Sequence, residues 1–205
     1  MTDIVVLGGS AGAADAIVTI CADLPAEFPV PVVLVMHVAS GDQTLFDTLV
    51  ARCALPVAHA RDGAVAGPGI WVAAPGLNVT VVNAGKAVQL RLGQGANPHL
   101  LQPSINPLFL SAAREFGSAV LGVLLSGFLD DGVEGLQAIK AAGGKVIVQS
   151  PLDAVVAEMP QAALRHLTAD SILPAAAIGP SLTALMHAVV IGAEQGAPVG
   201  KRARA

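Results

Sequence analysis

The sequence predicts an α/β fold: a doubly wound, mostly parallel sheet with an antiparallel hairpin and helices on both faces. Two observations carry this prediction. Short aliphatic and β-branched runs alternate with helical segments up to residue 53 and again after residue 104, as in a parallel sheet covered on both sides. Between these parts, apolar runs follow one another with only turn residues between them, which favours antiparallel strands.

The first part contains two buried apolar runs, each followed by a segment of helical character. Gly8-Gly9 bounds the first run, and Pro25 follows the first helical segment, as expected where a helix has ended. The predicted elements are strand 3–7, helix 11–22, strand 30–36 and helix 43–53.

The middle part contains short strands separated by turn residues. Pro75-Gly76 and Asn83-Ala84-Gly85 provide the turns. We expect antiparallel hairpin strands at 70–73, 78–82 and 87–90, and an irregular loop over the Gly-, Pro- and Asn-rich residues 93–107.

The alternation of helices and strands then returns. The predicted elements are helix 104–116, strand 120–125, helix 133–142, strand 145–149 and a helix at 159–166. Residues 171–193 carry no charge, but two prolines argue against a membrane span, and they are interpreted as strand, turn and buried helix. We expect one domain over residues 1–195 and a disordered tail over 196–205.

Composition excludes several classes of function. A net charge of −4, one Trp and no Tyr argue against nucleic-acid binding, which uses basic fields and aromatic stacking. Cys21 and Cys53 form no disulfide framework or metal cluster. No signal peptide is visible. We therefore expect a cytoplasmic protein with no metal, no cofactor, no nucleic-acid partner and no membrane insertion.

The first strand leads into a motif that carries chemistry. Residues 8–12 read Gly-Gly-Ser-Ala-Gly and match G-x-S-x-G between a predicted strand and a predicted helix. Such a turn presents the hydroxyl of Ser10 at the carboxyl end of the sheet, and the helix N-terminus offers N–H groups to an oxyanion. A structural Gly-rich turn is the alternative. The position after the first strand excludes the α/β-hydrolase fold, whose elbow follows several strands.

A base and an acid also follow predicted strands. His37 comes directly after the second strand, and the adjacent pair Asp130 and Asp131 follows the strand at 120–125. Catalytic groups gather at the carboxyl ends of parallel strands. One aspartate is expected to be the N-cap of the following helix, which leaves the other to orient the imidazole. Weaker candidates for the base are His59, His99, His166 and His187.

An ordered set of short motifs spans about residues 4–185. They are Val6–Gly12, Leu24-Pro25, Met36-His37, Asp62-Gly63, Pro68-Gly69, Ala73–Gly76, Pro103–Phe109, Ser111–Ala113, Gly122–Gly127, Asp131-Gly132, Gly135-Leu136, Ala142–Gly144 and Met159-Pro160. In this set the chain resembles the catalytic domain of chemotaxis protein-glutamate methylesterases, the CheB family.

The resemblance implies a serine hydrolase that converts glutamyl methyl esters of chemoreceptors to glutamate and methanol, with glutamine deamidation as a related activity. It places the nucleophile on Ser10, the base on His37 and the acid on Asp131 rather than Asp130. It implies methylated chemoreceptor helices as partners. The family's receiver domain is not expected in this chain, and a separate receiver-domain protein stays open as a partner.

The chain departs from the family pattern at several positions near these residues. Ala11 stands where a polar residue is usual, and Met36 replaces a common Gln. The loop Gln102–Asn106 lacks the usual Arg and Asp, which bears on substrate recognition. Phe128 and Leu129 replace Met and Gly, and we expect them to crowd the oxyanion region. A catalytically weak or inactive regulatory module of the same fold is therefore one alternative, and an unrelated nucleotide-binding protein is another.

Overall fold

The structure is a computed structural model, and it describes residues 3–37, 42–85, 87–94 and 103–194. Its centre is a parallel sheet in the order β10-β9-β8-β1-β2-β5-β3. The strands are β1 (Ile4–Gly9), β2 (Pro31–Met36), β3 (Val57–His59), β5 (Gly69–Val72), β8 (Val120–Leu124), β9 (Lys145–Gln149) and β10 (Ser171–Leu173).

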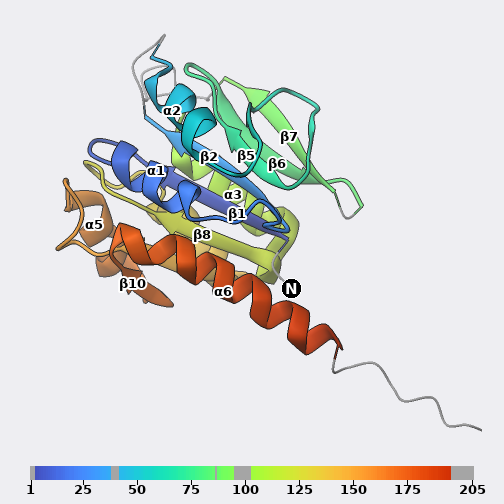
Figure 1. The fold of residues 1–205 in the computed structure, drawn as a ribbon. Coiled ribbons are helices and arrows are strands. Elements are labelled where there is room, and N and C mark those ends of the chain that lie inside the picture. Colours follow the sequence, from blue (N-terminus) through green and yellow to red (C-terminus); the bar gives the residue numbers. More distant parts are fainter. Residues whose placement is uncertain (1–2, 38–41, 86, 95–102, 195–205) are drawn as a thin grey trace, which may run out of the picture.

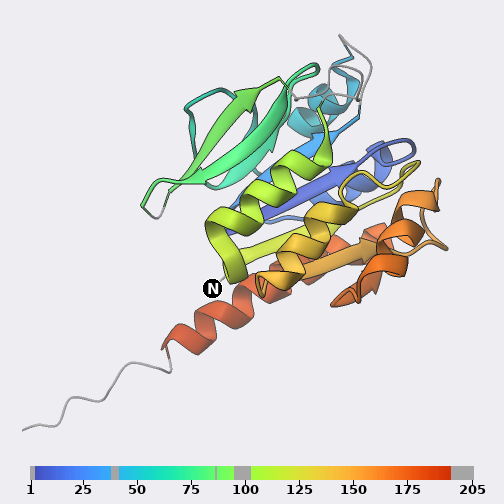
Figure 2. The same cartoon turned by 180° about the vertical axis from the view of Figure 1, so that it is seen from behind.

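Helices cover both faces of this sheet, as predicted. They are α1 (Ala14–Ala22), α2 (Thr44–Arg52), α3 (Ile105–Phe116), α4 (Val133–Ala141), α5 (Glu158–His166) and α6 (Ala175–Glu194), with a short 3-10 turn at Gly117–Ala119. Figure 1 shows α1 and α6 over one face. Figure 2, from behind, shows α3 and α4 over the other.

The two faces bury separate hydrophobic clusters because side chains alternate along a strand. In β1, Val5 and Leu7 pack in the cluster that includes residues of α1, α2 and α6. Ile4 and Val6 pack in the opposite cluster, which includes residues of α3, α4 and α5. All four side chains are fully buried, which explains why this strand is an unbroken apolar run.

A small antiparallel sheet lies beside the main one. It has the order β4-β7-β6, with β4 (Val65–Ala66), β6 (Asn78–Asn83) and β7 (Val88–Gly93). Val79, Val81 and Leu90 share a buried cluster with Leu108 of α3, so this sheet packs on α3. The predicted hairpin at 78–82 and 87–90 is therefore confirmed.

The run at 70–73 was expected in that hairpin, and this expectation is wrong. It forms β5, which pairs in parallel with β2 through Val32 and Ile70 and with β3 through Ala58 and Trp71. Ile70 is fully buried within the main sheet. A short apolar run fits either kind of sheet, and its long-range partners decide the outcome.

The glycines expected to end the first strand lie inside it. Gly8 and Gly9 pair with Val35 and Met36. A Cβ atom on Gly8 would lie 2.4 Å from Cγ2 of Ile105. The glycine therefore lets the first turn of α3 approach the end of β1.

The segment 171–193 forms β10 and α6, joined at Pro174, as expected. The helix was expected to be buried, but over residues 175–186 only one side of it is, with Ile178, Leu182 and Met186 among its buried residues. Pro180 lies within α6 rather than ending it. Among the described residues, no helix is both long and apolar enough to cross a bilayer. The predicted disordered tail at 196–205 lies outside the described residues.

Candidate active site

Three neighbouring strands end side by side at one edge of the main sheet. β1 lies between β2 and β8, with Gly9 level with Met36 and Gly8 level with Leu124. Ser10 follows β1, His37 follows β2 and Asp131 lies in the loop after β8. The strand order reverses direction at β1, and such switch points form crevices at the carboxyl ends of strands.

The turn after β1 holds Ser10 by its backbone. The Ser10 N–H donates to the Ser126 carbonyl at 2.9 Å, and the Ala13 N–H donates to the Ser10 carbonyl at 3.0 Å. Gly12 has a φ of +74°, and a Cβ there would lie 2.5 Å from Cβ of Val155. Glycine at this position of the motif therefore satisfies both a left-handed backbone and a close contact.

Ser126 braces the same turn from the end of β8. Its buried hydroxyl donates to the Ala11 carbonyl at 2.7 Å and accepts the Val156 N–H at 2.8 Å. It thereby ties the residue after Ser10 to the loop after β9. Sequence reasoning did not identify this role, because both partners are distant in the chain.

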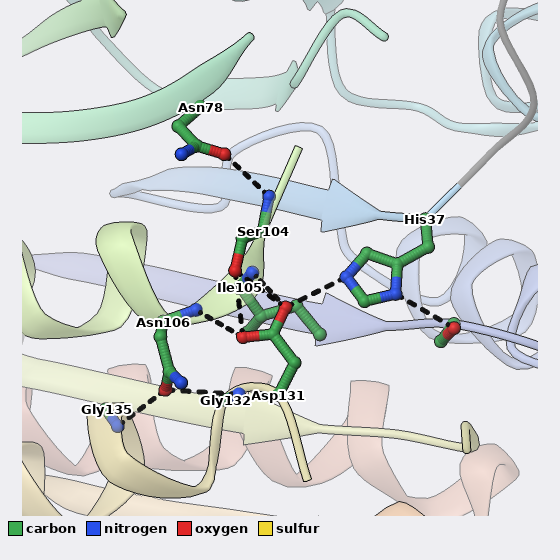
Figure 3. Close-up of polar contacts among 9 residues, drawn as sticks. His37, Asn78, Ser104, Ile105, Asn106, Asp131, Gly132 and Gly135 are labelled. Atoms are coloured by element: carbon green, nitrogen blue, oxygen red, sulfur yellow. Dashed lines mark hydrogen bonds and ion pairs between the residues drawn. The ribbon is translucent and has the colours of Figure 1, made fainter. Parts of the chain in front are cut away.

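His37 lies between Ser10 and Asp131. Its Nδ1 is 3.0 Å from Oγ of Ser10, and its Nε2 is 2.9 Å from Oδ2 of Asp131 (Figure 3). An ionised carboxylate only accepts hydrogen bonds, so Nε2 carries the proton and Nδ1 accepts from the Ser10 hydroxyl. In the Ser-His-Asp triad of serine proteases the roles are reversed: Nε2 faces the serine, and Nδ1 carries the proton that faces the aspartate. Either arrangement leaves one basic nitrogen facing the serine.

Asp131 receives hydrogen bonds from the start of α3 as well as from His37. The Ile105 N–H donates at 2.7 Å, the Asn106 N–H at 3.0 Å and the Ser104 hydroxyl at 2.9 Å (Figure 3). The carboxylate thus caps the N-terminus of α3 from another part of the chain, where the helix dipole favours a negative charge.

These contacts set the ionisation of Asp131. Burial acts to raise the pKa of its carboxyl, but the hydrogen bonds from His37, Ile105, Asn106 and Ser104 together outweigh burial and lower the pKa below its ordinary value. The side chain of Asp131 is 21% exposed and that of His37 is 11% exposed. The hydrogen bond between these two side chains is therefore largely shielded from solvent.

Asn106, in the first turn of α3, caps the N-terminus of α4 in turn. Its Oδ1 accepts the Gly132 N–H at 3.1 Å and the Gly135 N–H at 2.9 Å (Figure 3). Asp131 caps α3 while Asn106, on α3, caps α4. The pair locks the two helices and the acid in one arrangement.

This exchange corrects one expectation. Asp130 was a candidate for the N-cap of the helix at 133, but Gly132 is the N-cap residue and Asn106 supplies the acceptor. The loop Gln102–Asn106 was expected to bear on substrate recognition, and this stays a prediction; the Asn106 oxygen faces α4. Gln102 lies outside the described residues. The adjacent pair of aspartates is resolved by geometry, because Asp131 is the one that contacts His37.

The weaker histidine candidates have other surroundings. His59 on β3 stacks on Phe46, with 3.8 Å between ring centroids, and its Nε2 contacts Gln43. His166 lies at the end of α5. His99 and the side chain of His187 are outside the described residues. Within the described part of the chain, no cluster of three or more His, Cys, Asp or Glu side chains is placed to hold a metal ion.

Phe128 and Leu129 follow Gly127 in the loop after β8 and are largely exposed. Their side chains are 58% and 66% exposed. Most of both side chains therefore lies in solvent. That they crowd the oxyanion region stays a prediction.

Comparison with known proteins places this chain in a family. The family model described as CheB methylesterase matches residues 5–182. A protein-glutamate methylesterase/protein-glutamine glutaminase of Moorella thermoacetica is 38% identical over 187 residues, covering 90% of this chain and 44% of that protein. A putative protein of the same name from Leptospira interrogans is 33% identical over 170 residues, covering 82% and 87%.

A solved structure agrees with these relatives. The CheB methylesterase catalytic domain of Thermotoga maritima matches with a TM-score of 0.86 and 29% identity, over 90% of this chain and 99% of that one. The chain spans about half the length of several curated relatives that it matches. The described sheet, the antiparallel hairpin and the surrounding helices therefore have a solved counterpart, and the chain belongs to the CheB methylesterase family.

Proposed function

We propose that this protein hydrolyses glutamyl methyl esters on proteins, with Ser10 as nucleophile, His37 as base and Asp131 as the orienting acid. The observation that carries the proposal is the continuous hydrogen-bond chain from Ser10 through His37 to Asp131. Family membership supports the ester chemistry. Methylated chemoreceptors are the proposed substrates, as the family resemblance implies. Deamidation of protein glutamine is the proposed related activity, since the relatives are also named protein-glutamine glutaminases.

The proposed reaction proceeds through an acyl-enzyme. Oγ of Ser10 attacks the ester carbonyl carbon while Nδ1 of His37 takes the hydroxyl proton. The tetrahedral intermediate collapses, the C–O bond to the methoxy group breaks, and His37 returns the proton so that methanol leaves. Water then attacks the acyl-enzyme with His37 again as base, which releases the glutamate side chain and restores Ser10.

Asp131 stays ionised through this cycle. Its lowered pKa keeps a negative charge beside the imidazolium that forms when His37 takes the proton. Its hydrogen bond to Nε2 fixes the tautomer in which Nδ1 is free to act as base. The donors at the start of α3 hold the carboxylate in place.

Two backbone N–H groups are suited to stabilise the oxyanion. Within the described part of the chain, no acceptor pairs with the N–H of Ala11 or of Phe128. Ala11 follows Ser10 directly. Phe128 follows Gly127, where a Cβ would lie 2.8 Å from Cβ of Ser10. Preorganised donors of this kind typically contribute about 10²–10³-fold each to turnover.

Replacement of the nucleophile tests the proposal. Ser10→Ala should lower methanol release from a methyl-esterified receptor fragment by several powers of ten, as in other triads, because no nucleophile remains. A fluorophosphonate should label the parent protein and fail to label Ser10→Ala. Ser118→Ala, in the 3-10 turn before β8 and so at the opposite edge of the sheet, is the matched control and should retain both. Absence of labelling in the parent would favour the inactive module.

A further inference from the structure

Three large apolar residues on loops next to the turn that carries Ser10 are exposed to solvent. Phe128 is 58% exposed, Leu129 66% and Val155 78%. We call these three side chains the apolar rim. Scattered exposed apolar residues are ordinary, but a group of them beside a site marks an interaction surface.

The rim lies on two loops that both contact the turn carrying the nucleophile. Gly127, which precedes Phe128, has its Cβ position 2.8 Å from Cβ of Ser10. Val155 lies against Gly12, whose Cβ position is 2.5 Å from Cβ of Val155. The loop after β8 and the loop after β9 therefore both border the serine, and a molecule bound at Ser10 meets both.

Backbone hydrogen bonds join these two loops. The Gly127 N–H donates to the Val156 carbonyl at 3.0 Å, and the Met159 N–H donates to the Gly127 carbonyl at 2.9 Å. The Val156 N–H donates to the Ser126 hydroxyl at 2.8 Å. The rim is thus held in place before anything binds, which reduces the ordering entropy that binding must overcome.

Leu129 has an unfavourable backbone conformation as well as an exposed side chain. Its φ is +62°, and it is the only non-glycine residue with a positive φ in the described part of the chain. Left-handed backbone is unfavourable for a branched aliphatic residue because Cβ approaches the following carbonyl. Since its side chain is two-thirds exposed, burial within this chain does not offset the strain. Strained residues of this kind cluster at functional sites.

We infer that the apolar rim binds apolar side chains next to the esterified glutamate of the protein substrate, and that Leu129 is a specificity-determining residue. This inference rests on the proposed function. Because both loops contact the turn that carries Ser10, a protein segment that presents its ester to the serine is the occupant we assign to the rim. The segments 125–132 and 150–158 carry Asp130, Asp131, Asp153 and Glu158 and no Lys or Arg. This negative charge disfavours acidic side chains beside the ester.

The experiment measures affinity, so that it does not depend on turnover. Two folded, methyl-esterified receptor fragments are titrated into the Ser10→Ala protein. One has Leu residues flanking the esterified glutamate, and the other has Ser at the same positions. We expect about tenfold tighter binding of the Leu fragment, from burial of the exposed part of Leu129 and its neighbours.

Variants at Leu129 assign the preference. Leu129→Asn should reduce the ratio of the affinities for the Leu and Ser fragments to about one. It should also raise the melting temperature by about 2 °C, because Asn tolerates left-handed backbone. Leu129→Met keeps an apolar side chain and should retain the preference. Val65→Ser on β4, where Val65 is as exposed as Phe128, is the control and should also retain it.

Equal affinity of the two fragments, or an unchanged preference in Leu129→Asn, would overturn the inference. Self-association of the parent that Leu129→Asn abolishes would overturn it too, since the occupant would then be a second copy of the chain. If the Leu fragment is preferred but the parent releases no methanol, the apolar rim does bind apolar side chains and the proposed function is wrong.

Discussion

Replacing Asp131 by asparagine should damage both stability and turnover, because this side chain serves the site and caps a helix. Oδ2 of Asp131 accepts from Nε2 of His37 and from the Ile105 N–H. Oδ1 accepts from the Asn106 N–H, and the Ser104 hydroxyl contacts both oxygens. An amide has one acceptor oxygen and one NH₂ group. Whichever way it turns, the NH₂ group faces a backbone donor at the start of α3.

The size of the effect follows from these contacts. Leaving a buried donor without an acceptor costs about 1–3 kcal/mol, and losing a negative charge at a helix N-terminus costs about 0.3–1 kcal/mol more. We therefore expect Asp131→Asn to lower the free energy of unfolding by about 1–4 kcal/mol at neutral pH. We expect kcat to fall roughly 10⁴-fold, because the amide cannot hold His37 in the required tautomer.

The stability difference should depend on pH in a definite direction. The pKa of Asp131 is lower in the folded protein than its ordinary value of 3.8. A lowered folded pKa gives stability that is fully present above the unfolded pKa and is lost as pH falls through the folded pKa. The difference in free energy of unfolding between the parent and Asp131→Asn should thus be constant near neutral pH and should become smaller in acid.

The assay combines urea denaturation with hydrolysis of a small uncharged ester. Asp130→Asn is the matched control: Asp130 is exposed, and its side chain makes no hydrogen bond to any described residue. It should change stability by less than about 0.5 kcal/mol and should leave kcat nearly unchanged. The reasoning is refuted if Asp131→Asn unfolds at the parental urea concentration, or if the two substitutions reduce kcat equally.

Two further substitutions test the groups that brace the site. Asn106→Ala removes the acceptor for the first turn of α4 and should lower the free energy of unfolding by about 1–2 kcal/mol in urea; a stability equal to the parent's would contradict the exchange of caps. Ser126→Ala should cost about 1–3 kcal/mol and lower kcat for the small ester, since the Ala11 carbonyl loses its donor. Ser111→Ala, at a buried serine that also accepts a backbone N–H, should lower stability alike and leave kcat unchanged.

The strands and their ends could be predicted from local patterns. Runs of Val, Ile and Leu predict buried strands because those residues fit a sheet covered on both faces. The residues that follow such runs then lie at the carboxyl edge, which is how Ser10, His37 and the aspartate pair were selected. The order of short motifs added the family resemblance, and that resemblance favoured Asp131 over Asp130.

Pairing between distant segments could not be predicted in the same way. The run at 70–73 has a pattern that suits an antiparallel or a parallel strand, and its place between β2 and β3 depends on which strands are free to pair. The orientation of the His37 ring likewise depends on where Ser10 and Asp131 lie in space.

The capping exchange and the rim depended most on tertiary structure. A local pattern shows that a helix start needs an acceptor, but Asp131 and Asn106 supply acceptors to each other's helices across 25 positions of the chain. Leucine itself gives no signal of left-handed backbone at position 129; the one hint is that the family resemblance has glycine there. Local propensity thus identifies which residues end each strand, while contacts between residues far apart in sequence decide what each side chain meets.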